Sequence, residues 1–121
     1  MSETPAANET PVIYKIVPRT LWQKARDAGV FKGAAIDLTD GYIHFSTADQ
    51  VKETAARHFT GQEDLLLIAV DGSVLSDKLV FEPSRGGDLF PHLYDELPVD
   101  AVLWETPLTL NEDGAHQFPE I

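Results

Sequence analysis

The chain has 121 residues, of which 43% are hydrophobic, a formal net charge of −11 and no cysteine. A chain of this length can bury a core as one domain, and the lack of cysteine excludes thiol catalysis, disulfides and cysteine-ligated metals. The acidic balance argues against nucleic acid as a partner, and no apolar run reaches the roughly 18 residues of a membrane span. We therefore expect a soluble, unexported, cytoplasmic protein.

The first and last segments differ in composition from the middle of the chain. Residues 1–11 are rich in Ala, Glu, Thr and Pro without apolar periodicity, which predicts a disordered N-terminal tail. Residues 111–121 resemble a polar C-terminal tail, although Phe118 could dock on the body. We expect a single α+β domain at residues 12–110.

The domain opens with a predicted strand at residues 12–17 and a helix at residues 20–28, where Gly29 is expected as the C-cap. Residues 30–41 contain several turn signals and are expected to be irregular.

The next stretch, residues 42–47, alternates polar and apolar side chains, as a strand with one buried face does. Tyr42, His44 and Ser46 share its polar face. Because this strand leads into a helix N-terminus, His44 is well placed to contact an anion or a ribose hydroxyl. The alternative is a histidine that is hydrogen-bonded within the sheet.

A second helix is expected at residues 48–59, with Thr47 as N-cap and Gln50 as its partner in a capping box. The apolar run that follows at residues 64–70 predicts a strand buried on both faces, at the centre of a sheet. Later strands are predicted at residues 78–82, 90–97 and 101–108. Helices early and strands late favour an α+β fold over a regularly alternating parallel sheet.

Three stretches carry a family resemblance: YKIVP at residues 14–18, DGYIHFST at residues 40–47 and EPSRGGDLFPHLY at residues 82–94. With them, the chain resembles the bacterial family known as domain of unknown function 952, from about residue 14 to residue 108. That family is grouped by fold with the ADP-ribosyltransferase superfamily, whose members bind NAD in a cleft between two small antiparallel sheets. The resemblance implies such a fold, with two helices packed early in the chain and NAD as the leading cofactor.

The resemblance also implies roles for particular side chains. In the superfamily a strand histidine contacts NAD, and His44 matches it by position. An aromatic residue stacks on the nicotinamide ring, and Tyr94 is the first candidate, followed by Tyr42 and Phe90. We expect the strand at residues 42–47 and the stretch at residues 82–94 to face one another across a cleft.

The superfamily further uses a late glutamate to stabilise the developing oxocarbenium ion. Glu82 lies in the matched motif but precedes Tyr94, the reverse of the usual order, and Glu105 lies late but outside the matched stretches. A divergent branch, of the RNA 2′-phosphotransferase type, works with arginine and histidine instead. Arg85 and His92 fit that alternative.

We therefore expect a cleft for NAD, another small nucleotide or an anionic metabolite, with ADP-ribosyl transfer or NAD glycohydrolysis as the reaction to test. A non-catalytic module that binds a small metabolite in the same cleft is the alternative. No metal site is expected, because the four histidines lack short ligand spacing. The predicted catalytic residues are Glu82, His44 and His92. The predicted ligand-binding residues are His44, Ser46, Arg85, Phe90, His92 and Tyr94.

Overall fold

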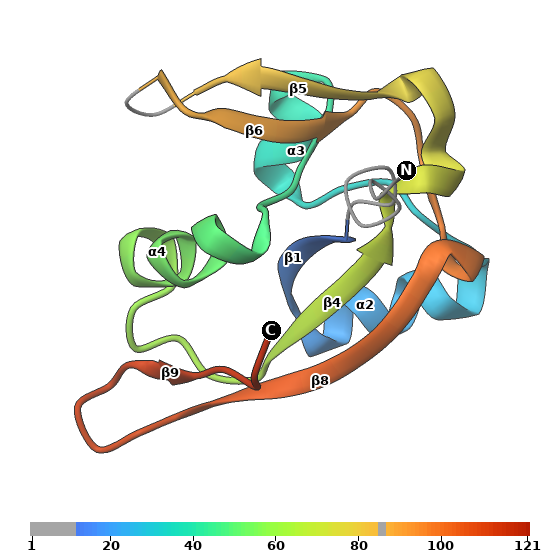
Figure 1. Cartoon of the computed structure of the whole chain (residues 1–121). Coiled ribbons are helices and arrows are strands. Elements are labelled where there is room, and N and C mark those ends of the chain that lie inside the picture. Colours follow the sequence, from blue (N-terminus) through green and yellow to red (C-terminus); the bar gives the residue numbers. More distant parts are fainter. Residues whose placement is uncertain (1–11, 85–86) are drawn as a thin grey trace, which may run out of the picture.

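The computed structural model describes residues 12–84 and 87–121, so the predicted N-terminal tail and Arg85 lie outside the described residues. A four-stranded sheet has the order β1 (Val12–Pro18), β4 (Leu65–Asp71), β8 (Val102–Leu110) and β9 (His116–Gln117). A three-stranded sheet has the order β3 (Ile43–His44), β6 (Leu89–Leu93) and β5 (Leu79–Pro83), and β2 (Val30–Phe31) pairs with β7 (Leu97–Pro98). All these pairs are antiparallel, and Figure 1 shows the three-stranded sheet above the four-stranded one.

The helices are α2 (Arg19–Ala28), α3 (Ala35–Asp40) and α4 (Ala48–His58), with 3₁₀ turns at Gly72–Lys78 and Val99–Ala101. Helix α2 ends at Gly29 as predicted, where a positive φ of 87° suits glycine. In the part of the chain that the structure describes, no helix is long and apolar enough to cross a membrane.

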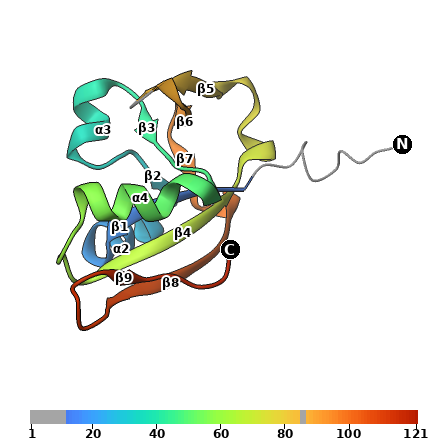
Figure 2. The same cartoon turned by 60° about the vertical axis from the view of Figure 1, so that its left-hand side comes forward.

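The central strand β4 is buried on both faces, which confirms the prediction from its apolar run. One face, with Leu66 and Ile68, packs in a cluster that includes Trp22 of α2, and the other, with Leu65 and Leu67, packs with Val51 of α4. The two helices therefore cover opposite faces of the four-stranded sheet (Figure 2). This mixed fold of antiparallel sheets and helices confirms the predicted α+β class.

The structure corrects the expectation that residues 30–41 are irregular. They contain β2 and the six-residue helix α3, which lacks the apolar stripe that sequence periodicity relies on, since Ile36 and Leu38 are exposed and Asp37 is buried. Helix α3 begins with the backbone N–H of Ala34 bonded to the Asp37 carboxylate at 2.8 Å.

Two predicted strands differ in their extent, and the segment expected as a polar tail contains a short strand. The strand predicted at residues 42–47 is reduced to β3, with one further bridge from Ser46 to Tyr14 of β1. The strand predicted at residues 90–97 is split, because β6 ends at Leu93 and β7 starts at Leu97. In the segment expected as a polar tail, β9 pairs with β8, and Phe118 packs against the core.

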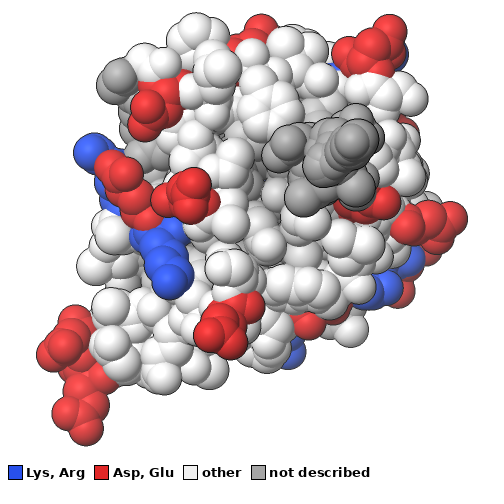
Figure 3. Space-filling model, viewed as in Figure 1, with Lys and Arg blue, Asp and Glu red and all other residues white. Residues whose placement is uncertain are grey.

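Acidic side chains are scattered over the face shown in Figure 3, with basic side chains among them. The net charge of −11 is therefore not gathered into one binding patch on this face.

Candidate functional site

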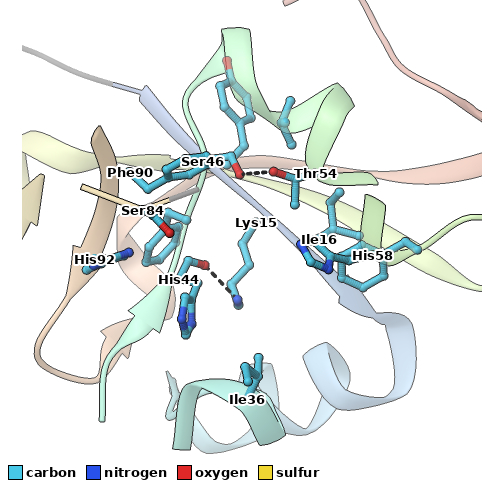
Figure 4. A pocket seen from close by; sticks show the side chains of 14 residues that line it. Lys15, Ile16, Ile36, His44, Ser46, Thr54, His58, Ser84, Phe90 and His92 are labelled. Carbon is cyan, nitrogen blue, oxygen red and sulfur yellow. Dashed lines mark hydrogen bonds between the residues drawn. The ribbon is translucent and has the colours of Figure 1, made fainter. Parts of the chain in front are cut away.

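A pocket of about 570 Å³ lies where β1 and α4 meet the three-stranded sheet, with Ile36 of α3 also in its wall (Figure 4). Most of its wall is apolar and aromatic, and its volume is within the range of small-molecule sites. Its polar lining groups come from Lys15, His44, Ser46, Thr54, His58, Ser84 and His92. A hydrogen bond of 3.0 Å joins the hydroxyls of Ser46 and Thr54.

His44 and His92 are direct partners in the antiparallel pair of β3 and β6. Partners across an antiparallel pair emerge on the same face, and the two ring centroids are 5.4 Å apart. Both histidines line the pocket. The two motif stretches are therefore neighbours within one sheet, and the expectation that they face one another across a cleft is wrong.

His44 contacts a buried carboxylate, that of Asp37. Its Oδ1 is 2.6 Å from His44 Nδ1 and accepts the His44 backbone N–H at 3.0 Å, while its Oδ2 is 3.1 Å from Lys15 Nζ. The Lys15 ammonium also donates to the His44 carbonyl at 2.8 Å. Asp37 and Lys15 thus hold both the ring and the backbone of His44.

Burial and neighbouring charges shift the pKa values of Asp37 and Lys15 in opposite directions. Burial alone would raise the pKa of Asp37, but the hydrogen bond from His44, the Lys15 ammonium and the N–H groups of Ala34 and His44 outweigh it and lower that pKa to about 2. Burial lowers the pKa of Lys15, and Asp37 offsets only part of this effect. Asp37 is therefore ionised at neutral pH.

The other ring nitrogen of His44, Nε2, lies 3.0 Å from Oδ2 of Asp40, the last residue of α3. Both nitrogens of the ring therefore face carboxylates, which fix its orientation at the pocket wall. His44 is at once hydrogen-bonded within the fold and exposed to the pocket, so it combines the two alternatives that its sequence position suggested.

His92 is held by a second carboxylate, Glu82. The Glu82 Oε1 atom is 2.7 Å from His92 Nδ1 and accepts the Tyr94 hydroxyl at 2.7 Å. These two hydrogen bonds lower the pKa of Glu82, and the bond to Glu82 raises the pKa of Tyr94 to about 12. Among the described residues, no hydrogen bond joins His92 Nε2 to a partner, so this nitrogen is the one that can serve a ligand.

Tyr42 packs over this histidine pair. Its ring stacks on His92 with centroids 4.2 Å apart and lies 4.6 Å from the ring of His44 and 5.2 Å from that of Tyr94. Tyr42 and Tyr94 do not line the pocket, whereas Phe90 does. Of the three aromatic candidates, Phe90 is the one placed to contact a ligand there.

The predicted catalytic and ligand-binding residues that the structure describes therefore separate into two groups. His44, Ser46, Phe90 and His92 line the pocket. Glu82 and Tyr94 lie behind His92 and act on it or on each other, and Arg85 lies outside the described residues.

Glu105, the late glutamate, does not reach the pocket. On β8, its Oε2 accepts the Trp22 indole N–H at 2.7 Å and the Arg26 Nε–H at 2.9 Å. These contacts fasten α2 to the four-stranded sheet, so Glu105 has a structural role.

Sequence reasoning missed Lys15 and Asp37. The signal for Lys15 was a lysine among the apolar residues of a strand that is otherwise buried. Asp37 gave no such signal, because it lies between turn residues in a segment without apolar periodicity. Within the described residues, no group of three or more His, Asp or Glu side chains is arranged to hold a metal ion.

Comparison with known proteins gives one matching family and solved structures of one similar protein. The sequence profile of the family "Protein of unknown function (DUF952)" matches residues 16–105. The crystal structure of protein CC0527 from Caulobacter crescentus is 48% identical, with a TM-score of 0.85 over 88% of this chain and 93% of that one. The solution NMR structure of CC0527 is also 48% identical, with a TM-score of 0.80 over 88% and 91%. No curated protein matches the chain.

Proposed function

The chain belongs to the DUF952 family, and from this premise we propose that its pocket binds a nucleotide of the NAD type. The observation that carries the proposal is the pairing of His44 with His92 at the wall of a pocket whose other lining is largely apolar and aromatic. Both histidines come from stretches that resemble the family. A pocket of this kind suits a ligand with one flat ring and several polar substituents.

A nucleotide offers groups that match this lining. Phe90 and the apolar side chains can pack against a base or a nicotinamide ring. The Ser46 and Thr54 hydroxyls and the imidazole of His92 can exchange hydrogen bonds with ribose hydroxyls. The proposal also takes the antiparallel sheets on either side of the pocket as an ADP-ribosyltransferase-like arrangement, which the family resemblance implies.

Cleavage of the nicotinamide glycosidic bond is the reaction that such a pocket would support: water or an acceptor hydroxyl bonds to the ribose carbon and gives up a proton, and nicotinamide leaves with the bonding electron pair. His92 would contact the ligand through Nε2, and Glu82 would orient His92 through Nδ1. Glu82 itself does not line the pocket, so we assign it a positioning role rather than direct contact with the developing oxocarbenium ion.

Binding without catalysis is the second candidate function, and one observation favours it. The three described carboxylates beside the two histidines are already bonded within the protein: Asp37 to Lys15 and His44, Asp40 to His44, and Glu82 to His92 and Tyr94. A module that binds a small metabolite needs no free carboxylate.

The binding proposal is tested by titrating the 15N-labelled protein with NAD, ADP-ribose and AMP and following chemical shifts by NMR. His92→Ala and Ser46→Ala should weaken binding by about tenfold each, because each removes a hydrogen-bonding group from the pocket. His116→Ala is the matched control, since His116 lies on β9 and bonds the Gln62 carbonyl outside the pocket. Absence of binding by all three ligands at millimolar concentration would rule out the nucleotide.

Catalysis is tested separately by chromatographic detection of nicotinamide released from NAD. Glu82→Gln should slow release by weakening the orientation of His92, while NAD affinity changes little. Binding of NAD without any release of nicotinamide would favour the module.

A further inference from the structure

Lys15 offers the pocket a hydrogen-bond donor that the family motifs around His44 and His92 do not include. Its side chain is only 9% exposed and lines the pocket. In Figure 4 it reaches from β1 to the His44 strand, where its Nζ donates to the His44 carbonyl. An ammonium has three N–H donors, and one of them donates to the His44 carbonyl. The two oxygens of the Asp37 carboxylate, 3.4 and 3.1 Å from Nζ, lie on the same side of the ammonium and share a second N–H. One N–H therefore remains for an atom in the pocket.

The charge of Lys15 is already balanced by its surroundings. Asp37 lies 3.1 Å from the ammonium, and further carboxylates stand behind the two histidines, Asp40 on His44 and Glu82 on His92. Among the described residues that line the pocket, Lys15 alone is a lysine or arginine. Carboxylates thus outnumber ammonium groups at this end of the pocket, so a further anion would meet net repulsion.

Asp37 cannot serve the ligand in place of Lys15. Its two oxygens already face Lys15, the Ala34 N–H and both the backbone and the ring of His44. Its side chain is also 1% exposed. Asp37 therefore holds the ammonium in place, and Lys15 is left to make the contact.

Resting on the nucleotide-binding function proposed above, we propose that Lys15 is a specificity-determining residue that selects an uncharged oxygen acceptor of the ligand. A carboxamide, a carbonyl or a hydroxyl oxygen accepts the remaining N–H without adding charge. A carboxylate or phosphate at the same position adds a negative charge beside Asp37, Asp40 and Glu82. The phosphates of a bound nucleotide accordingly lie away from Lys15.

The test compares pairs of ligands that differ only in an amide or an acid: nicotinamide against nicotinic acid, and NAD against its nicotinic acid analogue. The wild-type protein is used, with NMR detection of the 15N-labelled lysine ammonium groups. The amide of each pair should shift the Lys15 signal and bind about tenfold more tightly than the acid. Equal or tighter binding of the acids, or no response of Lys15 to any amide, overturns the inference.

The outcomes separate this inference from the proposed function. Binding of both dinucleotides with equal affinity and no Lys15 shift removes the role of Lys15 but leaves nucleotide binding in place. A Lys15 shift with nicotinamide, but no binding of either dinucleotide, supports the role of Lys15 and rules out nucleotide binding.

Variants give a second readout. Lys15→Met combined with Asp37→Asn removes the donor without leaving an unpaired buried charge, and the amides should bind about tenfold more weakly than they bind the wild type. Lys52→Met, on the exposed side of α4, is the matched control and should keep the wild-type affinity for the amides. Wild-type affinity for the amides in the double variant contradicts the inference.

Discussion

Two carboxylates in this protein accept hydrogen bonds from nitrogen donors and pair with a cation, yet they lie in different surroundings. Glu105 joins α2 to the four-stranded sheet through Trp22 and Arg26, where Arg26 is 47% exposed and no described residue of the cluster borders the large pocket. Asp37 joins α3 to β1 and β3, and its partners Lys15 and His44 line that pocket. The contrast shows that pairing alone does not mark a functional carboxylate. The partners of a functional carboxylate must also face a cavity.

The largest expected effect is on stability at the buried cluster. Asp37→Asn leaves Lys15 without a counter-charge and should lower the free energy of unfolding by about 3–5 kcal/mol. Glu105→Gln should cost about 1 kcal/mol or less, because its ion pair is half-exposed and an amide oxygen still accepts from Trp22. Urea denaturation of both variants measures the difference, and equal losses would mean that the clusters are equivalent.

The loss of stability at low pH should depend on the same buried cluster of Asp37, Lys15 and His44. The pKa of Asp37 falls from an ordinary 3.8 to about 2 on folding, so the unfolded chain binds more protons between these pH values. The contribution of Asp37 is therefore fully present above about pH 4 and is lost as the pH falls through about 2; it amounts to about 2 kcal/mol. Denaturation at a series of pH values checks this. A wild-type acid limb no steeper than that of Asp37→Asn would contradict it.

A smaller change is expected where the pocket region meets α4. Gln50 accepts the Thr47 N–H at 3.0 Å and donates to the Leu89 carbonyl at 2.8 Å, which connects the start of α4 to β6. Gln50→Ala should lower the free energy of unfolding by about 1 kcal/mol, because it removes two hydrogen bonds that are at most partly buried. Lys52→Ala on the same helix is the control and should leave stability nearly unchanged.

The smallest effect on stability is expected at Tyr94, but the pKa of its hydroxyl gives a specific readout. The Glu82 carboxylate raises the pKa of Tyr94 to about 12, so Glu82→Gln should return it toward about 10. Absorbance titration of the phenolate near 295 nm follows this change, and Tyr94→Phe identifies which transition belongs to Tyr94. An unchanged titration in Glu82→Gln would show that the carboxylate does not hold this hydroxyl in solution.

The elements with strong local signals were predictable from the sequence. The apolar run of β4 and the amphipathic α2 and α4 follow directly from side-chain periodicity, and the alternation around His44 indicated a face with polar chemistry. The family motifs then selected four residues that line the pocket.

What could not be predicted depends on distant contacts. The direct pairing of His44 with His92 is set by strand register between segments far apart in sequence, which local patterns do not encode. Helix α3 is too short to show periodicity, and Asp37 acquires its role only when Lys15 from β1 reaches it. The different roles of Glu82 and Glu105 could be recognised only from the residues that each contacts in the folded structure.

The six residues of α3 have a further consequence for local unfolding. A helix this short is not stable by itself, and Ile36 and Leu38 on it are 59% and 66% exposed. Its anchors are the contacts of Asp37 and Asp40 with the ring of His44, together with the Lys15 ion pair. The amide protons of α3 should therefore exchange with solvent long before those of β4, so that the wall of the pocket that contains Ile36 opens while the core stays closed.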